Sequence, residues 1–149
     1  MGRRHIDVTK HSAAGLHAVF ALLADGTTWP RWSPIESFEL ERPGDPPPEG
    51  VGAVRVFRRG RTVGRDEIVE VVPDRRLDYV SLSGLPVRDY RAHVTLEPHG
   101  DGTAIRWQAS FLPKVPGTGW ILERGLRRFL CECAAGVAAH AARSPFSAA

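Results

Sequence analysis

Several residue types and motifs are scarce or missing in this sequence. The 149 residues include only two cysteines and two lysines, and no apolar run is long enough to span a bilayer. The chain contains no GxSxG, Walker A, GxGxxG or HExxH pattern, which excludes the nucleophile, nucleotide and zinc chemistries that these motifs carry. No apolar segment follows the basic start, so we expect no signal peptide and a cytoplasmic protein.

The two cysteines do not form a reactive or metal-binding pair. Cys131 and Cys133 fall within a helical pattern, where a spacing of two residues turns their side chains about 200° apart. Cys133 lies on the apolar stripe and is expected in the core. His93 falls on the polar face of a strand. We therefore expect no metal and no cofactor.

Basic residues outnumber acidic residues, and the formal net charge is +3. Arg58, Arg59 and Arg61 gather at one expected turn, but acidic residues are interspersed along the whole chain. This mixture favours solvated turns over a nucleic-acid surface. We expect no nucleic-acid partner, no membrane insertion, and either a monomer or a homodimer.

The first third of the chain predicts one strand and two short helices. Residues 5–11 alternate between apolar and polar side chains, which predicts a strand. Apolar residues at three- and four-residue spacing predict a helix over 13–24, with Ser12 as its N-cap. A short second helix carries Trp29 and Trp32 between two prolines, and burial of its rings would hold it.

From residue 35 the pattern predicts six further strands and one long helix. The strands are expected at 35–41, 51–58, 61–72, 77–83, 88–96 and 103–112. Residues 119–143 form an amphipathic helix that Ser144 and Pro145 end. An antiparallel sheet with one apolar face needs a cover, and this helix is the element large enough to supply it. We predict an α+β fold in a single domain, 1–149, with a core at about 5–143.

Three stretches of sequence carry a resemblance to a known family. They are residues 19–25 with 29–34, residues 84–90 leading into 94–98, and Gly102-Thr103 followed by Trp107. With the order of elements, they make the chain similar to the START-like or Bet v 1-like (SRPBCC) superfamily, and within it to bacterial polyketide cyclase/dehydrase-type proteins. The resemblance implies a helix-grip fold, in which a curved seven-stranded antiparallel sheet surrounds a long C-terminal helix and two short helices follow strand 1. It also implies a cavity between sheet and helix for an apolar molecule.

Candidate ligand-binding residues lie on the expected inner faces and near the expected cavity entrance. Alternation places Tyr90 on the apolar face of its strand, where its hydroxyl would hold a ligand or serve as a general acid. The other candidates are Trp107, Phe111, Tyr79, Ser81, Trp32, Trp120, Leu126 and Phe129. For Trp107 and Phe111, plain packing in the core is an equal alternative. Tyr79 and Ser81 could instead lie on the outer face of their strand, and the segment with Trp120 could be a rigid connection.

The sequence does not decide which side chains of the strand at 61–72 face the core. If Val63, Val69 and Val71 face inward, Arg65 and Glu67 share their face and become candidate acid-base residues. If Ile68 and Val72 face inward, both charged side chains meet solvent. The sequence thus predicts binding of a lipid- or polyketide-like molecule. A cofactor-independent cyclase, aromatase or dehydratase using Tyr90 with Glu67 or Arg65 is the alternative, and whether the protein is an enzyme stays undecided.

Overall fold

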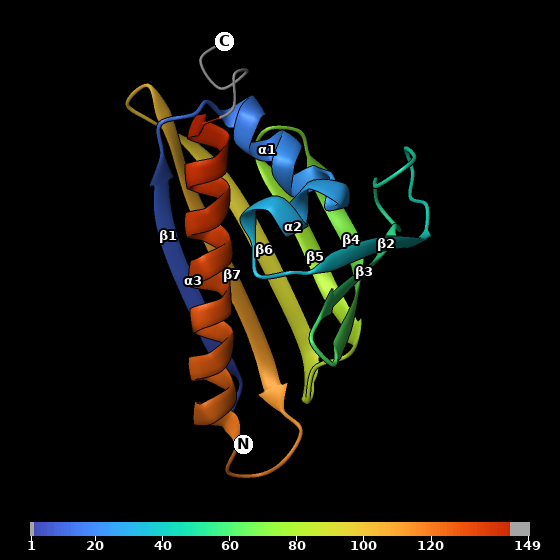
Figure 1. The fold of residues 1–149 in the computed structure, drawn as a ribbon. Helices are drawn as coiled ribbons and strands as arrows, with labels where there is room; N and C mark the ends of the chain where they lie inside the picture. The colour runs from blue at the N-terminus through green and yellow to red at the C-terminus, as the bar shows by residue number, and fades with distance from the viewer. Residues whose placement is uncertain (1, 144–149) are drawn as a thin grey trace.

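The computed structural model describes residues 2–143, and the expected helix end at Ser144-Pro145 lies outside them. Seven strands and three α-helices make up this part of the chain (Figure 1). The elements are, in order, β1 (Arg4–Ser12), α1 (Leu16–Ala24), the 3-10 turn η1 (Gly26–Thr28), α2 (Trp29–Trp32), β2 (Ser37–Arg42), β3 (Val54–Arg59), β4 (Thr62–Val72), β5 (Arg76–Ser83), β6 (Val87–His99), β7 (Gly102–Pro113) and α3 (Gly119–Arg143). The predicted α+β helix-grip fold is confirmed.

The strands form one antiparallel sheet in the order β1-β7-β6-β5-β4-β3-β2. The chain crosses once from β1 to the far edge at β2 and then returns strand by strand until β7 pairs with β1. In Figure 1 the sheet bends around α3, while α1 and α2 lie over its upper part. Alternation puts the apolar side chains of β6 and β7 on the covered face, as their period of two requires.

The start of α1 differs from the expectation. Ser12 closes β1 and is not the N-cap, since Gly15 holds that position without a side-chain hydrogen bond. The Ser12 hydroxyl instead donates to the Ala138 carbonyl at 2.7 Å and accepts the Ala14 amide at 3.1 Å. The residue therefore fastens the end of β1 to the end of α3.

The four-residue helix α2 is held by its two tryptophans, as expected from its length. The indole nitrogen of Trp29 donates to the Leu23 carbonyl at 3.2 Å, and that of Trp32 donates to the Thr28 hydroxyl at 3.0 Å. Both rings are buried and lie 4.6 Å apart between centroids. Such a short helix would not persist in water without this burial.

The long helix α3 packs on the sheet most closely along its C-terminal half. Its fully enclosed side chains there are small or of medium size, namely Leu130, Cys133, Ala134, Val137, Ala138 and Ala141. Between residues 120 and 129 none is buried. The helix therefore closes the core at one end and leaves space beside the sheet at the other.

Candidate functional site

The space beside the N-terminal half of α3 is a cavity of about 260 Å³ between helix and sheet. Most of its wall is carbon, contributed by aromatic and aliphatic side chains. Its lining residues are Trp29, Ile35, Phe57, Arg59, Thr62, Gly64, Asp66, Tyr79, Ser81, Leu85, Tyr90, Gly125, Leu126 and Phe129.

The inner end of the cavity is closed by aromatic rings. Trp29, Phe57, Tyr79 and Tyr90 are all buried there, together with Ile35. The ring centroids of Trp29 and Phe57 lie 4.6 Å apart, and Trp29 and Trp107 form a T-shaped pair with centroids 5.9 Å apart. The hydrogen bond from Trp29 to the Leu23 carbonyl holds the indole in this position in the wall.

Two tyrosine hydroxyls bring polar atoms into this apolar end. Tyr79 on β5 accepts a hydrogen bond from the indole nitrogen of Trp107 at 3.1 Å, and it is hydrogen-bonded in turn to Tyr90 on β6. Burial raises the pKa of Tyr79 and of Tyr90 above the usual range of tyrosine, and the nearby Asp66 adds to both shifts. Both hydroxyls therefore stay protonated and can donate or accept hydrogen bonds.

Asp66 on β4 places a carboxyl group in the same wall. Burial raises its pKa to about 7, and the positive charge of Arg55 only partly opposes this shift. No residue in 2–143 donates a hydrogen bond to its carboxyl group. An apolar surrounding disfavours the charged form of an acid, so Asp66 is divided between its two protonation states near neutral pH.

Arg55 lies directly opposite Asp66 on β3 and is completely buried. Its guanidinium lies 5.1 Å from the ring centroids of both Trp29 and Phe57. One terminal nitrogen donates to the Leu23 carbonyl at 3.1 Å and to Glu49 at 3.5 Å, whereas Nε and the second terminal nitrogen have no partner within 2–143. Arg55 thus supports the cavity wall from behind and supplies a fixed positive charge.

A second aspartate shows how strongly the surroundings decide the charge. Asp78 on β5 points to the opposite face of the sheet, where Arg76 and His93 both reach its carboxylate, His93 at 3.0 Å. Burial works against ionisation there too, but the hydrogen bonds from Arg76 and His93 outweigh it and lower the pKa of Asp78. His93 therefore belongs to this outer ion cluster, as its polar strand face predicted.

The cavity opens between the β3–β4 hairpin, the β5–β6 turn and the N-terminal half of α3. Arg59, Thr62 and Gly125 are exposed at this opening, and Leu85, Leu126 and Phe129 are partly exposed. The guanidinium of Arg59 lies over the Phe129 ring at 5.6 Å from its centroid. One positive charge therefore stands at the entrance.

Two glycines in the lining leave room for larger side chains. A Cβ atom on Gly125 would meet nothing within 4 Å, and one on Gly64 would meet only the Phe57 carbonyl oxygen at 3.8 Å. Gly64 faces the cavity from β4 and Gly125 faces it from α3. Both positions therefore accept a Cβ atom beside the cavity without a close contact.

The structure brings five of the nine predicted ligand-binding residues to the cavity. These are Tyr90, Tyr79, Ser81, Leu126 and Phe129. Trp107, Phe111 and Trp32 are buried in the core outside the lining, where Phe111 stacks on Tyr90 at 6.5 Å between centroids. Trp120 lies on the surface with 58% of its area exposed.

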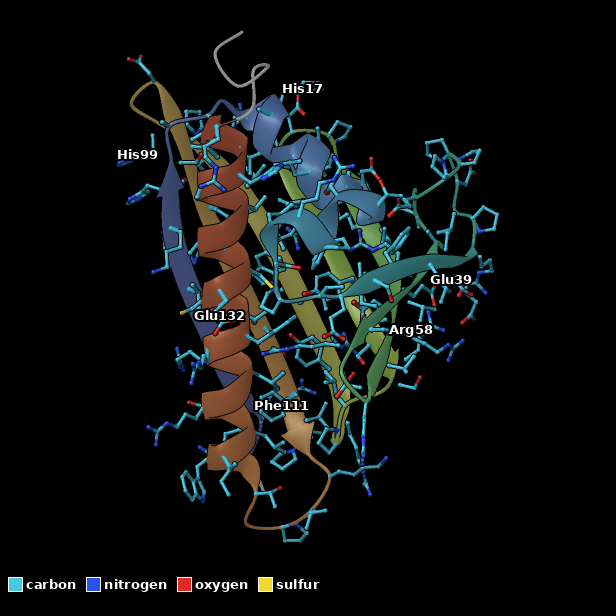
Figure 2. The ribbon with its side chains drawn as sticks, viewed as in Figure 1. His17, Glu39, Arg58, His99, Phe111 and Glu132 are labelled. Atoms are coloured by element: carbon cyan, nitrogen blue, oxygen red, sulfur yellow. The ribbon has the colours of Figure 1, made fainter. Side chains whose placement is uncertain are left out.

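Arg65 and Glu67 do not reach the cavity, which corrects their candidacy as acid-base residues. Ile68 and Asp66 face inward, so the neighbouring residues of β4 face outward. Arg65 is hydrogen-bonded twice to Glu41, at 2.6 and 2.7 Å, and Glu67 lies 3.6 Å from Arg42. Similar ion pairs continue along this outer side, including Glu39 with Arg58, which Figure 2 shows at the β2–β3 edge of the molecule.

Sequence reasoning missed Asp66, Phe57 and Arg59. The one available signal for Asp66 was that it lies two residues from Ile68 and so shares its strand face. Two irregularities in the β4–β5 pairing weaken this signal. Nothing in the sequence singled out Phe57, because β3 is buried on both faces. Among residues 2–143 no helix is long and apolar enough to cross a membrane, and no cluster of His, Cys, Asp and Glu could hold a metal ion.

A curved antiparallel sheet that grips a long C-terminal helix around a cavity defines the START-like class of proteins. The chain belongs to the family described as polyketide cyclase / dehydrase and lipid transport, whose sequence profile matches residues 3–142. No curated protein sequence matches the chain.

Solved structures share this fold at low sequence identity. The Zhui aromatase/cyclase from Streptomyces sp. R1128 has a TM-score of 0.81 and 19% identity, with 95% of each chain covered. A START superfamily protein from Mycobacterium smegmatis has a TM-score of 0.80 and 14% identity, covering 94% of this chain and 97% of its own. The protein Ara h 8.0201 has a TM-score of 0.77 and 16% identity, covering 96% of this chain and all of its own. At these identities the likeness establishes the fold alone.

Proposed function

We propose that this protein binds a small, mainly apolar molecule that carries at least one hydrogen-bonding group. The observation that carries the proposal is a mainly apolar, aromatic cavity, open on one side, whose lining includes Asp66, Tyr79 and Tyr90. Small-molecule sites commonly combine an apolar wall with a few convergent polar groups. The family description, which includes lipid transport, supports the same class of ligand.

The size of the cavity limits what it holds. Its volume of about 260 Å³ is just below the range of roughly 300–1,000 Å³ that is typical of ligand pockets. A compact molecule of two or three fused rings suits this space better than a long acyl chain. The flat faces of Trp29, Phe57 and Tyr90 would then stack on the rings of the ligand.

The proposal is tested by native mass spectrometry of the freshly purified protein and by fluorescence titration with 2-naphthol, a two-ring alcohol. We expect a co-purified small molecule or saturable naphthol binding. Gly64→Leu fills the cavity and should abolish binding, whereas Gly125→Ala, at the mouth, should preserve it. Wild-type protein that binds nothing, or equal binding by Gly64→Leu, would overturn the proposal.

A second function is favoured by one observation, the carboxyl group of Asp66 with its pKa of about 7 inside the cavity. An acid-base group is most useful when its pKa lies near the working pH. In a cyclase, the Asp66 carboxylate would take a proton from a carbon between two carbonyl groups. That carbon would then bond to a further carbonyl carbon, and the proton would pass to the new alkoxide. Loss of water would follow.

This second function has its own test. A short β-polyketone thioester is incubated with the protein, and ring closure is followed by mass spectrometry as the loss of water. Catalysis should rise with pH through about 7 and vanish in Asp66→Asn. If the substrate stays bound but unchanged, binding alone is the function.

A further inference from the structure

The end of the molecule at which the cavity opens combines exposed apolar side chains with unpaired positive charge. All connections that follow β3, β5 and β7 lie at this end, together with the starts of β1 and α3, as the antiparallel order requires. Figure 1 shows the three connections toward the bottom of the view. We call this surface the mouth face and define it by two sets of residues.

The first set is apolar. Eight large hydrophobic residues are exposed in the chain from 2 to 143, and five of them lie at the mouth face. They are Val63, Leu82, Val115, Trp120 and Ile121. Trp120 and Ile121 are each more than half exposed and adjoin the turn of α3 that carries Gly125 and Leu126 of the cavity wall. Exposing large apolar side chains to water is unfavourable. Their gathering at one end of the molecule therefore points to a surface that binds a partner.

The second set is basic. Five exposed cations at this end have no acidic partner within residues 2–143, namely Arg59, Arg61, Arg88, Lys114 and Arg124. The acidic groups nearby are already engaged. Glu36 accepts the Gly60 amide at 2.7 Å, Asp89 is held by Arg3 and Arg91, and Glu123 by Arg4 and Arg127. The mouth face therefore carries an uncompensated positive charge.

We propose that the mouth face docks on an anionic lipid surface and places the cavity entrance against it. Its residues come from the β3–β4 and β7–α3 connections, from the adjoining ends of β3, β4, β5 and β6, and from the start of α3, an arrangement that suits a broad plane. Tryptophan and aliphatic side chains enter the boundary between lipid headgroups and acyl chains, while Arg and Lys stay among the charged headgroups. This docking deepens the proposed binding function, because an apolar ligand could pass from the lipid into the cavity without crossing water.

The contact would be peripheral and dominated by charge. Each Arg or Lys near an anionic bilayer contributes about 1 kcal/mol, and salt screens this attraction. The protein should therefore bind vesicles that contain phosphatidylglycerol and dissociate from them in high salt. It should not bind vesicles of phosphatidylcholine alone.

Vesicle sedimentation with these two lipid compositions provides the test. Replacing Arg61, Arg88 and Arg124 together with glutamine should weaken binding by about tenfold or more. A matched control replaces Arg31, Arg75 and Arg143, three exposed cations away from the mouth face, and should bind as the wild type does. Trp120→Ala should also weaken binding, whereas Val72→Ala, another exposed apolar residue away from this end, should not.

Tryptophan fluorescence tests the depth of the contact. Trp29, Trp32 and Trp107 are buried and only Trp120 is exposed, so a blue shift on adding vesicles reports Trp120 entering lipid. Absence of binding to anionic vesicles, or equal losses in the control variants, would overturn the proposal. Tight binding to soluble polyglutamate without a blue shift would also overturn it, in favour of an acidic protein partner.

The outcome can be separated from that for the cavity. Gly64→Leu places its new side chain in the cavity and replaces no residue of the mouth face, so it should still dock on vesicles. Docking without naphthol binding in the wild type would reject the cavity function alone. Naphthol binding without docking would reject the mouth face alone.

Discussion

Both halves of α3 lie against the concave face of the sheet, but only the C-terminal half packs closely on it. In the C-terminal half, Ala134, Ala138 and Ala141 are buried and allow close approach. In the N-terminal half, Leu126 and Phe129 are only partly buried and stand beside an open cavity. The C-terminal half packs in the core and the N-terminal half borders the cavity, and substitutions in the two halves should therefore have different consequences.

The largest contrast is expected between two leucines of this helix. Leu130 is 1% exposed, and its change to alanine should cost about 3 kcal/mol of the free energy of unfolding because it leaves a void in close packing. Leu126→Ala only widens an existing cavity and should cost less than about 1 kcal/mol. Urea denaturation of both variants measures the difference, and equal losses would refute the division of the helix.

The glycines of α3 offer a second contrast with opposite signs. A Cβ atom on Gly136 would lie 1.7 Å from the Trp32 carbonyl oxygen, so Gly136→Ala must push α2 and α3 apart at a cost of about 2 kcal/mol. Gly125→Ala meets nothing and should gain up to about 1 kcal/mol from helix propensity. Thermal unfolding of the two variants is the measurement, and a destabilised Gly125→Ala would contradict it.

The cavity next to the N-terminal half should also make stability depend on pH through Asp66. The carboxyl group titrates near 4 in the unfolded chain, whereas its pKa in the folded protein is about 7. Between these values the folded state keeps a proton that the unfolded state has lost, so this group lowers stability as the pH rises.

Asp66→Asn removes this dependence and should gain stability relative to the wild type between pH 5 and pH 8. The gain should be roughly 1–2 kcal/mol, less than full linkage would give, because the cavity admits water. Denaturation at both pH values gives the result. Asp78→Asn is the control: its pKa is lowered, so its loss of stability should not diminish between pH 5 and pH 8.

The smallest expected effect concerns the two thiols of α3. Burial raises the pKa of Cys133, which is completely enclosed, while Cys131 is partly exposed. A thiol reagent should modify one cysteine in the native protein, and Cys131→Ala should remove that reaction with little change in stability. Two reactive thiols under native conditions would show that the C-terminal half opens readily.

The sequence predicted the architecture well because the strands and α3 have strong periodicity. The alternation of β6 and β7 assigned the inner face correctly, with Tyr90, Trp107 and Phe111 all buried. The alternation could not show which inner residues line a cavity and which are packed in the core, because that depends on the elements that cover the sheet. Near Trp107 the cover includes Trp29 of α2, whereas near Tyr90 space remains.

The candidate acid-base residue was missed for a different physical reason. Valine occurs at both parities of β4, so apolar periodicity favours neither face. The irregular pairing at Arg65/Asp66 and Ile68/Glu70 then breaks the strict alternation of inward and outward residues along β4. Only the neighbouring strands decide which face of β4 is the inner one. Arg55 of β3 pairs with Asp66, and Tyr79 of β5 pairs with Ile68.

The open position at Gly125 has a consequence for how the protein changes over time. A Cβ atom there would lie at the entrance of the cavity and meet nothing within 4 Å. Most residues of a binding site are tied to the fold, so mutation must trade ligand preference against stability. Under the proposed binding function, a side chain larger than alanine at position 125 would change which molecules enter the cavity at little cost in stability.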